Sequence, residues 1–149
     1  MTPSNSNPTI SDGAMSYVSI LLGLISNQDW EQFEKQALAA DPRTFKFISK
    51  FISEECGDLL GGMTLLHSVV RYDPPIELLV QMIELYPAAL GGCDCLGRTP
   101  LHVAAGSGAS TNVMKILMVN CPGACSIQDE DGRTPLHFAC DTSCELFED

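Results

Sequence analysis

A four-residue segment recurs along this chain at a fixed interval of 35 residues. Thr99-Pro-Leu-His102 is followed at that interval by Thr134-Pro-Leu-His137, and a related segment, Thr64-Leu-Leu-His67, precedes it at the same distance. A glycine lies two residues before each threonine, at Gly62, Gly97 and Gly132. Like segments at a constant step are typical of stacked supersecondary units, each of which buries its apolar face against the next. The sequence therefore predicts a row of similar units.

Each complete unit is predicted to contain two helices. The first begins at or just after the threonine, whose hydroxyl can cap it, and a proline in the first turn costs nothing there. The second is expected at about residues 76–85 in one unit and 112–119 in the next, because apolar residues recur there at helical spacing. Pro87 and Pro122 follow these helices and end them.

The segments that begin at Asp94 and Asp129 resemble ankyrin repeats. Each reads D-x-x-G-x-T-P-L-H-x-A, and the likeness extends over roughly residues 59–145, with two good copies and a weaker first one. The resemblance implies an all-α fold, a short ankyrin-type α-solenoid of helix-turn-helix repeats with a protruding turn between units. It also implies that the threonines and histidines have a structural role, and that the glycines supply the positive φ of the turns.

The chain departs from the family pattern in ways that bear on its N-terminal part. The step is 35 rather than the family's usual 33, with one extra residue near positions 109–111 and one near 121–123. In the first unit Leu65 replaces the proline, and Val69 and Val70 replace an alanine pair. Because larger side chains should push that helix away from its neighbour, we expect an irregular helical cap in front of the repeats.

The predicted organisation has three parts. Residues 1–13 are rich in Ser, Asn, Pro and Thr and are expected to be disordered. Residues 14–56 form the helical cap, and residues 57–149 form the repeats. The repeat units are expected at about 59–93, 94–128 and 129–149, the last of them incomplete.

Three helices are expected in the cap. The first covers residues 14–26, with an inner face of Met15, Val18, Leu21, Leu22 and Ile25. The second is capped by Ser26 or Asn27 and runs to residue 39 or 40, with an inner face of Trp30, Phe33, Ala37 and Leu38. The third covers about residues 43–54, with Phe47, Ile48, Phe51 and Ile52 on one stripe and Phe45 off it.

The last unit stops after a first helix expected at residues 135–147. Three explanations stay open: acidic residues close the stack of a short protein, the chain is a fragment of a longer one, or a partner supplies the missing helix.

Charge restricts the classes of partner. Eight basic and nineteen acidic residues give a net charge of −11. Such a chain repels nucleic acid and anionic lipid surfaces, which need basic patches, so we expect neither as a partner. Between residues 129 and 149 there are seven acids and one base. This local excess fits a partner with a basic patch, or equally a solvated acidic terminus.

Seven cysteines, an odd number, show no secreted-scaffold pattern, and no secretory signal is visible. A reducing setting, the cytoplasm or the nucleus, fits best. The apolar stretch 14–25 is shorter than the roughly 20 residues that span a bilayer.

The histidines and cysteines each allow a functional and a structural interpretation. The three histidines lie one per repeat, too far apart to share an ion at ~2 Å, so we expect them to be structural. The pairs Cys93/Cys95, Cys121/Cys125 and Cys140/Cys144 have spacings compatible with zinc. Because Cys125 aligns with Leu90 and Cys140 with Ala105, we favour ordinary packing, with an exposed thiol at Cys95. No catalytic motif is present, so we expect no enzyme activity, no metal and no cofactor.

The turns between units and the exposed positions of the first helices are the candidate partner-binding surface. Tyr and Arg are enriched at binding hot spots, and Leu60, Met63 and Leu96 are expected to form an apolar centre. The candidates are Leu60, Met63, Arg71, Tyr72, Cys95, Leu96, Arg98, Ser107, Glu130, Asp131, Arg133, Asp141 and Thr142. The other interpretation is that these are exposed loop side chains of a solubilised scaffold.

The leading hypothesis is a monomeric, non-catalytic module that binds another protein through this surface. One alternative is an N-terminal regulatory or targeting domain of a larger protein. The other is a thiol-based metal sensor.

Overall fold

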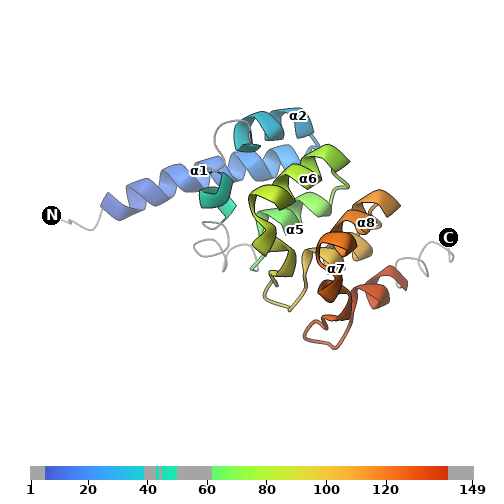
Figure 1. The fold of residues 1–149 in the computed structure, drawn as a ribbon. Helices are drawn as coiled ribbons and strands as arrows, with labels where there is room; N and C mark the ends of the chain where they lie inside the picture. The colour runs from blue at the N-terminus through green and yellow to red at the C-terminus, as the bar shows by residue number, and fades with distance from the viewer. Residues whose placement is uncertain (1–5, 39–42, 44, 50–61, 141–149) are drawn as a thin grey trace.

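The computed structural model describes residues 6–38, 43, 45–49 and 62–140, and these fold into two layers of helices. A first-helix layer contains α1 (Ser6–Ser26), α5 (Leu65–Val70) and α7 (Pro100–Gly106), with the helical residues 135–140 beside α7. A second-helix layer contains α2 (Trp30–Phe33), its continuation η2 (Glu34–Leu38), α6 (Ile76–Leu85) and α8 (Thr111–Asn120) (Figure 1). The structure has no strand within these ranges, so the predicted all-α solenoid of helix pairs is confirmed.

The helices of the repeats lie where the sequence placed them. α6 has the predicted bounds, and α8 is longer than predicted by one residue at each end. Pro87 and Pro122 end these helices, as expected, and each begins a short 3-10 helix, η3 (Pro87–Gly91) and η4 (Pro122–Ser126). The residues after the second helix therefore form one more helical turn before the chain enters the next unit.

The turns between units stack closely on one another. We call residues 94–98 the second finger and residues 129–133 the third finger. The N–H of Glu130 donates to the Leu96 carbonyl across 2.9 Å and so joins the two fingers. Gly97 has φ +80°, and a Cβ there would lie 3.2 Å from the Asp129 Cα. Glycine is therefore needed both for the left-handed backbone and for the close approach of the next finger.

The loops at the other end of the helix pairs share a backbone geometry that the sequence did not reveal. Gln28, Asp73 and Gly108 lie in the three successive loops, and all have positive φ, between 56° and 73°. The Gln28 Nε2 donates to the Tyr72 carbonyl across 2.9 Å, and the Ser110 N–H donates to the Asp73 carboxylate across 2.9 Å. The cap therefore continues both layers in the same geometry as the repeats.

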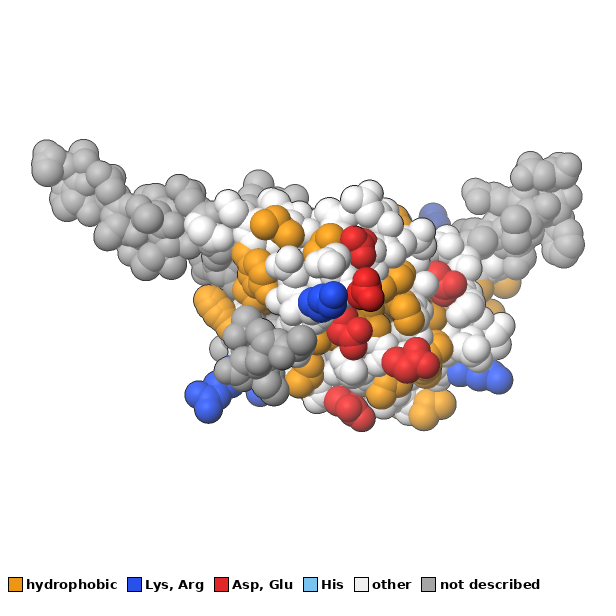
Figure 2. All heavy atoms as spheres, turned by 90° about the horizontal axis from the view of Figure 1, so that it is seen from above, with side chains coloured by type: hydrophobic (Ala, Val, Ile, Leu, Met, Phe, Trp, Pro, Cys, Tyr) orange, Lys and Arg blue, Asp and Glu red, His pale blue; other side chains and the backbone are white. Residues whose placement is uncertain are grey.

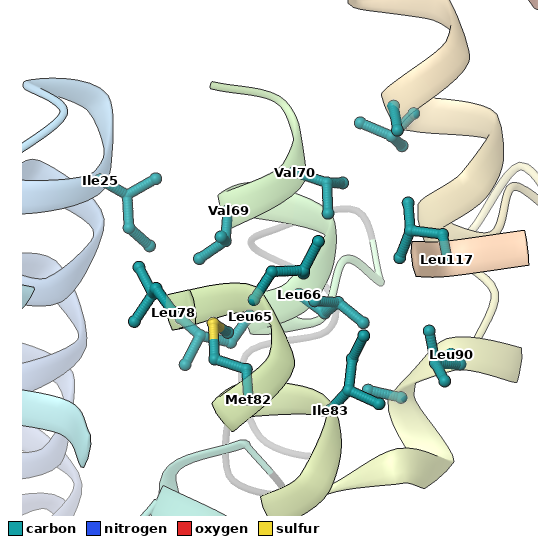
Figure 3. Packing of buried hydrophobic residues seen from close by; sticks show 14 of the residues in the cluster. Ile25, Leu65, Leu66, Val69, Val70, Leu78, Met82, Ile83, Leu90 and Leu117 are labelled. Atoms are coloured by element: carbon teal, nitrogen blue, oxygen red, sulfur yellow. The ribbon is translucent and has the colours of Figure 1, made fainter. Parts of the chain in front are cut away.

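One apolar core runs through the cap and the repeats. Ile25 of α1 faces Val69 of α5, and Leu66 and Ile83 lie toward Leu117 of α8 (Figure 3). All six residues of α5 are buried. Isolated helices shorter than about 12 residues are marginal in water, so this helix depends on its neighbours on both sides. The units are therefore not independent of one another.

The helices of the cap differ from the prediction at both ends of α1. The helix begins at Ser6 rather than residue 14, so residues 6–13 are helical and were wrongly predicted to be disordered. Pro8 falls in the first turn, where a missing N–H breaks no helical hydrogen bond. Met1–Asn5 and the side chain of Met15 lie outside the described part, as does the predicted boundary at 56/57.

The residue that caps the N-terminus of the second helix was also predicted wrongly. Asp29 caps α2 by accepting from the Gln32 N–H, whereas Ser26 or Asn27 was expected. The end of α1 explains the difference. The N–H groups of Gln28 and Asp29 bond back to the carbonyls of Ile25 and Leu24, a Schellman arrangement that uses residues 27–28 as the turn. As predicted, Phe33 and Ala37 are buried, while Trp30 and Leu38 are half-buried.

The helical segment 45–49 faces the core with a different stripe from the one predicted. Phe45 and Ile48 are buried, whereas Phe47 is 51% exposed. Phe45 borders a small gap against Leu65 and Met82, so packing on the first repeat fixes the orientation of this segment. The predicted stripe residues Phe51 and Ile52 lie outside the described residues.

The stacking of the fingers predicts a difference between two glycines with the same backbone geometry. Gly132 has φ +81°, and a Cβ there meets no described atom within 4 Å. Gly132→Ala should lower the free energy of unfolding by about 1–2 kcal/mol, the cost of a left-handed alanine. Gly97→Ala should cost more, because the third finger must also shift. Urea denaturation followed by circular dichroism measures both.

Gly123→Ala is the control for this pair, because Gly123 has no positive φ and its Cβ would meet nothing within 4 Å. It should leave the unfolding curve nearly unchanged. Equal losses for Gly97→Ala and Gly132→Ala would contradict the close approach of the fingers.

Candidate functional site

The second finger is held by one buried carboxylate. The Asp94 Oδ1 accepts from the N–H groups of Leu96 and Arg98 at 2.9 and 2.8 Å, and its Oδ2 accepts from the Arg98 Nε at 2.8 Å. The Asp94 side chain is fully buried, while that of Arg98 is 29% exposed. Charge-assisted bonds of this length fix both the turn and the arginine.

The third finger repeats this turn with a more exposed acid. The Asp129 Oδ1 accepts from the N–H groups of Arg133 and Asp131 at 2.8 and 2.9 Å. The Arg133 N–H holds the pKa of this carboxyl below its usual range, and the Asp131 N–H acts in the same direction. Glu130, Asp131 and Arg133 are exposed at this turn.

Each finger leads into a first helix that begins with the same pair of residues. The hydroxyl of Thr99 accepts from the His102 N–H at 3.3 Å, and the His102 Nδ1 accepts from the Thr99 N–H at 3.1 Å. Thr64 and His67 form the same reciprocal capping box. As predicted, the threonine caps the helix, and the histidine satisfies the backbone at the turn.

The second nitrogen of each buried histidine reaches the following finger. The Nε2 of His67 bonds to the Arg98 carbonyl at 2.8 Å, and that of His102 to the Arg133 carbonyl at 2.9 Å. Because Nδ1 accepts a backbone N–H and Nε2 faces a carbonyl, the proton lies on Nε2. The His102 ring also packs edge-on against Phe138 of the last unit, with centroids 5.2 Å apart.

Burial lowers the pKa of His67 below the ordinary value of histidine. The bond to the Arg98 carbonyl acts against this effect, but burial is the larger cause. The neutral ring is therefore the form that the fold requires.

His137 of the last unit differs from the other two histidines. Its Nδ1 makes the same bonds with Thr134, at 3.0 Å to the N–H and 2.9 Å to the hydroxyl, but its ring is exposed. Within the described ranges, no carbonyl accepts from its Nε2. The three histidines therefore share the capping role, and two of them also join successive units.

Three of the predicted binding residues lie around one groove of the first-helix layer. Met63, Arg71 and Tyr72 line a groove of about 240 Å³ between α1 and α5. An Arg71 guanidinium nitrogen approaches the Met63 sulfur at 3.8 Å. Leu22 and Ser26 of the cap complete the wall.

The cap residues of this groove were not predicted as binding residues. Helical spacing assigned Leu22 to the core stripe of α1, and the structure leaves it half-buried at the edge of that stripe. The sequence offered no signal for the position of α1 beside α5, so the groove could not be predicted.

The remaining predicted residues lie on the fingers and the loops. Leu96 is 47% exposed and does not line the groove with Met63, so the expected apolar centre is not brought together there. Cys95 and Ser107 are exposed. Leu60, Asp141 and Thr142 lie outside the described residues.

The exposure of two cysteines differs from the prediction. Cys95 is exposed as expected, but Cys125 and Cys140 are exposed too, although packing positions were predicted for them. Their counterparts Leu90 and Ala105 are buried. Cys140 lies in the last unit. Cys125 lies at the end of the second unit, which is followed in the described chain by a first helix alone, whereas Leu90 and Ala105 are followed by further helices of both layers or by that first helix. Cys144 lies outside the described residues.

No group of three or more His, Cys, Asp or Glu side chains is placed to hold a metal ion in the part of the chain that the structure describes. Among the helices described here, none is both long enough and apolar enough to cross a membrane.

Comparison with known families decides the assignment. The profile described as "Ankyrin repeats (3 copies)" matches residues 66–148, more than half of the chain. The chain belongs to the ankyrin-repeat family. No curated protein matches it. Ankyrin repeats are in general protein–protein interaction modules, and the family is typically non-catalytic.

The buried histidine of the first ankyrin repeat predicts a pH-dependent stability. Between the lowered pKa of folded His67 and the ordinary pKa of the unfolded chain, the unfolded state binds more protons. The contribution of neutral His67 to the free energy of unfolding is therefore complete above the pKa that this histidine has in the unfolded chain. It is lost as the pH falls toward the lower pKa of the folded state. The free energy of unfolding should decrease between about pH 7.5 and about pH 5.5.

His67→Gln separates this effect from other titrating groups. The variant should lose about 1–3 kcal/mol at the higher pH, the usual cost of unsatisfied buried partners, but should depend less on pH than the natural chain. His137→Gln at the exposed position is the matched control and should lose less. Urea titrations at both pH values measure these differences. If the free energy of unfolding of His67→Gln depended on pH as strongly as that of the natural chain, His67 would not be the source of the pH dependence.

Proposed function

We propose that this ankyrin-repeat chain is a non-catalytic module that binds a polypeptide partner through the first-helix layer and the adjoining fingers. The observation that carries the proposal is the groove between α1 and α5. It combines an arginine and a tyrosine with apolar side chains, the residue mix enriched at binding hot spots.

The fingers extend this surface beyond the groove. Leu96 is 47% exposed on a turn that Asp94 fixes through three hydrogen bonds. A rigid turn with an exposed leucine loses little conformational entropy when a partner binds. The acids Glu130 and Asp131 on the next finger favour a partner that is basic at that end.

Site-specific photo-crosslinking tests where the partner binds. A photoreactive phenylalanine analogue at Arg71 or at Leu96 should crosslink one common protein in the native cell extract. The same group at Lys115, an exposed position of α8 in the other layer, should not capture that protein. Capture from Lys115 but not from Arg71 or Leu96 would overturn the proposal.

The captured partner then allows a quantitative prediction. Arg71→Ala and Leu96→Glu should each weaken binding about fivefold or more, the effect of losing a residue worth more than 1 kcal/mol. Both side chains are exposed and neither belongs to the buried core, so the circular dichroism spectrum and the thermal midpoint should stay unchanged. Lys115→Ala is the control and should bind as the natural chain does.

A further inference from the structure

A second groove lies on the opposite layer, away from the proposed binding surface. It runs between α2 with η2 on one side and the C-terminal half of α6 on the other, with a volume of about 580 Å³. Leu38 and Leu85 lie in this groove and are half-buried. Both also pack against the edge of the core, so the exposed parts of these leucines form a fixed apolar base.

Charged side chains of mainly one sign surround this apolar base. Glu31 and Glu34 line it from α2 and η2, and Glu84 lines it from α6, against the single cation Lys35. All four are exposed, and within the described residues none of them makes an ion pair or a side-chain hydrogen bond. Acidic side chains gather around a basic one on the face seen from above (Figure 2).

The walls of the groove restrict the form that a ligand can take. Both walls are helices, so neither offers the unpaired strand edge to which an extended peptide could add. A helix satisfies its own backbone and presents side chains on one face, which is the helix-in-groove mode of recognition. The acidic rim further requires that this helix be basic beside its apolar stripe.

We propose that this groove binds a basic amphipathic helix of a partner protein. Apolar side chains of that helix rest on Leu38 and Leu85, and its Lys or Arg side chains lie against Glu31, Glu34 and Glu84. This groove shares no residue with the first-helix layer, so the proposal for one surface can fail without affecting the proposal for the other. Seven residues line the groove, fewer than the roughly 20–30 on each side of a standard interface, so we expect a weak interaction that salt weakens further.

A model peptide provides the direct test. The probe is a fluorescein-labelled 14-residue peptide of leucines and lysines at helical spacing, used with the full chain at concentrations where the peptide alone is monomeric. Fluorescence anisotropy should show saturable binding, and amide chemical shifts should change at residues 31–38 and 81–85. A peptide with glutamate in place of lysine should not bind.

Charge substitutions on the two sides of the groove should have opposite effects. Glu84→Gln should weaken binding of the lysine peptide, and Lys35→Gln should strengthen it, each by about 2–5-fold, as for one exposed charge pair. Glu77→Gln and Lys115→Gln change the net charge equally but lie outside the groove lining, in the first turn of α6 and on α8. These two controls should leave the affinity unchanged.

Several results would overturn the proposal. No detectable binding would do so, as would equal binding of the glutamate peptide. Equal effects of Glu84→Gln and Glu77→Gln would mean that binding depends only on the net charge of the chain. Shift changes confined to the fingers would assign the peptide to the first-helix layer. Shift changes at residues 31–38 that follow protein concentration without any peptide would make a second copy of the chain the occupant.

Discussion

The bonds of His67 and His102 connect each of the three repeats to the next. On one side of each ring, Nδ1 accepts the threonine N–H and completes a capping box; on the other, Nε2 donates to a carbonyl of the following finger. Both rings are fully buried, so the loss of either bond would leave a polar group without water. The start of each first helix, the shape of the next finger and the spacing of the units are therefore fixed together.

These bonds explain why the helix bounds of the repeats could be predicted from the sequence, whereas the helix ends and the orientation of segment 45–49 in the cap could not. Threonine, histidine and glycine have chemical reasons to occupy their positions, so their recurrence carries structural information. In the cap, the geometry follows from tertiary packing. Phe45 and Phe47 are equally apolar, and their different burial depends on where the first repeat lies. The positive φ of Gln28 gave no compositional signal either, because glutamine is not a residue that favours it.

In the candidate surfaces, too, repeated residues could be predicted from the sequence, whereas features that depend on tertiary packing could not. Sequence reasoning found Met63, Arg71 and Tyr72 because they recur at repeat positions, and the structure gathers them around one groove. It missed Leu22 and Ser26 because their exposure depends on the contact between α1 and α5. It missed the outer groove for a similar reason, since Glu31 and Glu84 are 53 positions apart in the chain and meet through the contact of η2 with α6.

The seam of loops formed by Gln28, Asp73 and Ser110 has a mechanical consequence. The first and second repeats are joined at both ends of their helices, by the bond of His67 to the Arg98 carbonyl at the finger end and by the bond of the Ser110 N–H to the Asp73 carboxylate at the other. Two helix pairs that are bonded at both ends cannot pivot freely against one another, so hydrogen bonds within the chain fix how these two repeats are oriented. A surface that extends over these two repeats keeps its shape before a partner binds, and association then costs little backbone entropy.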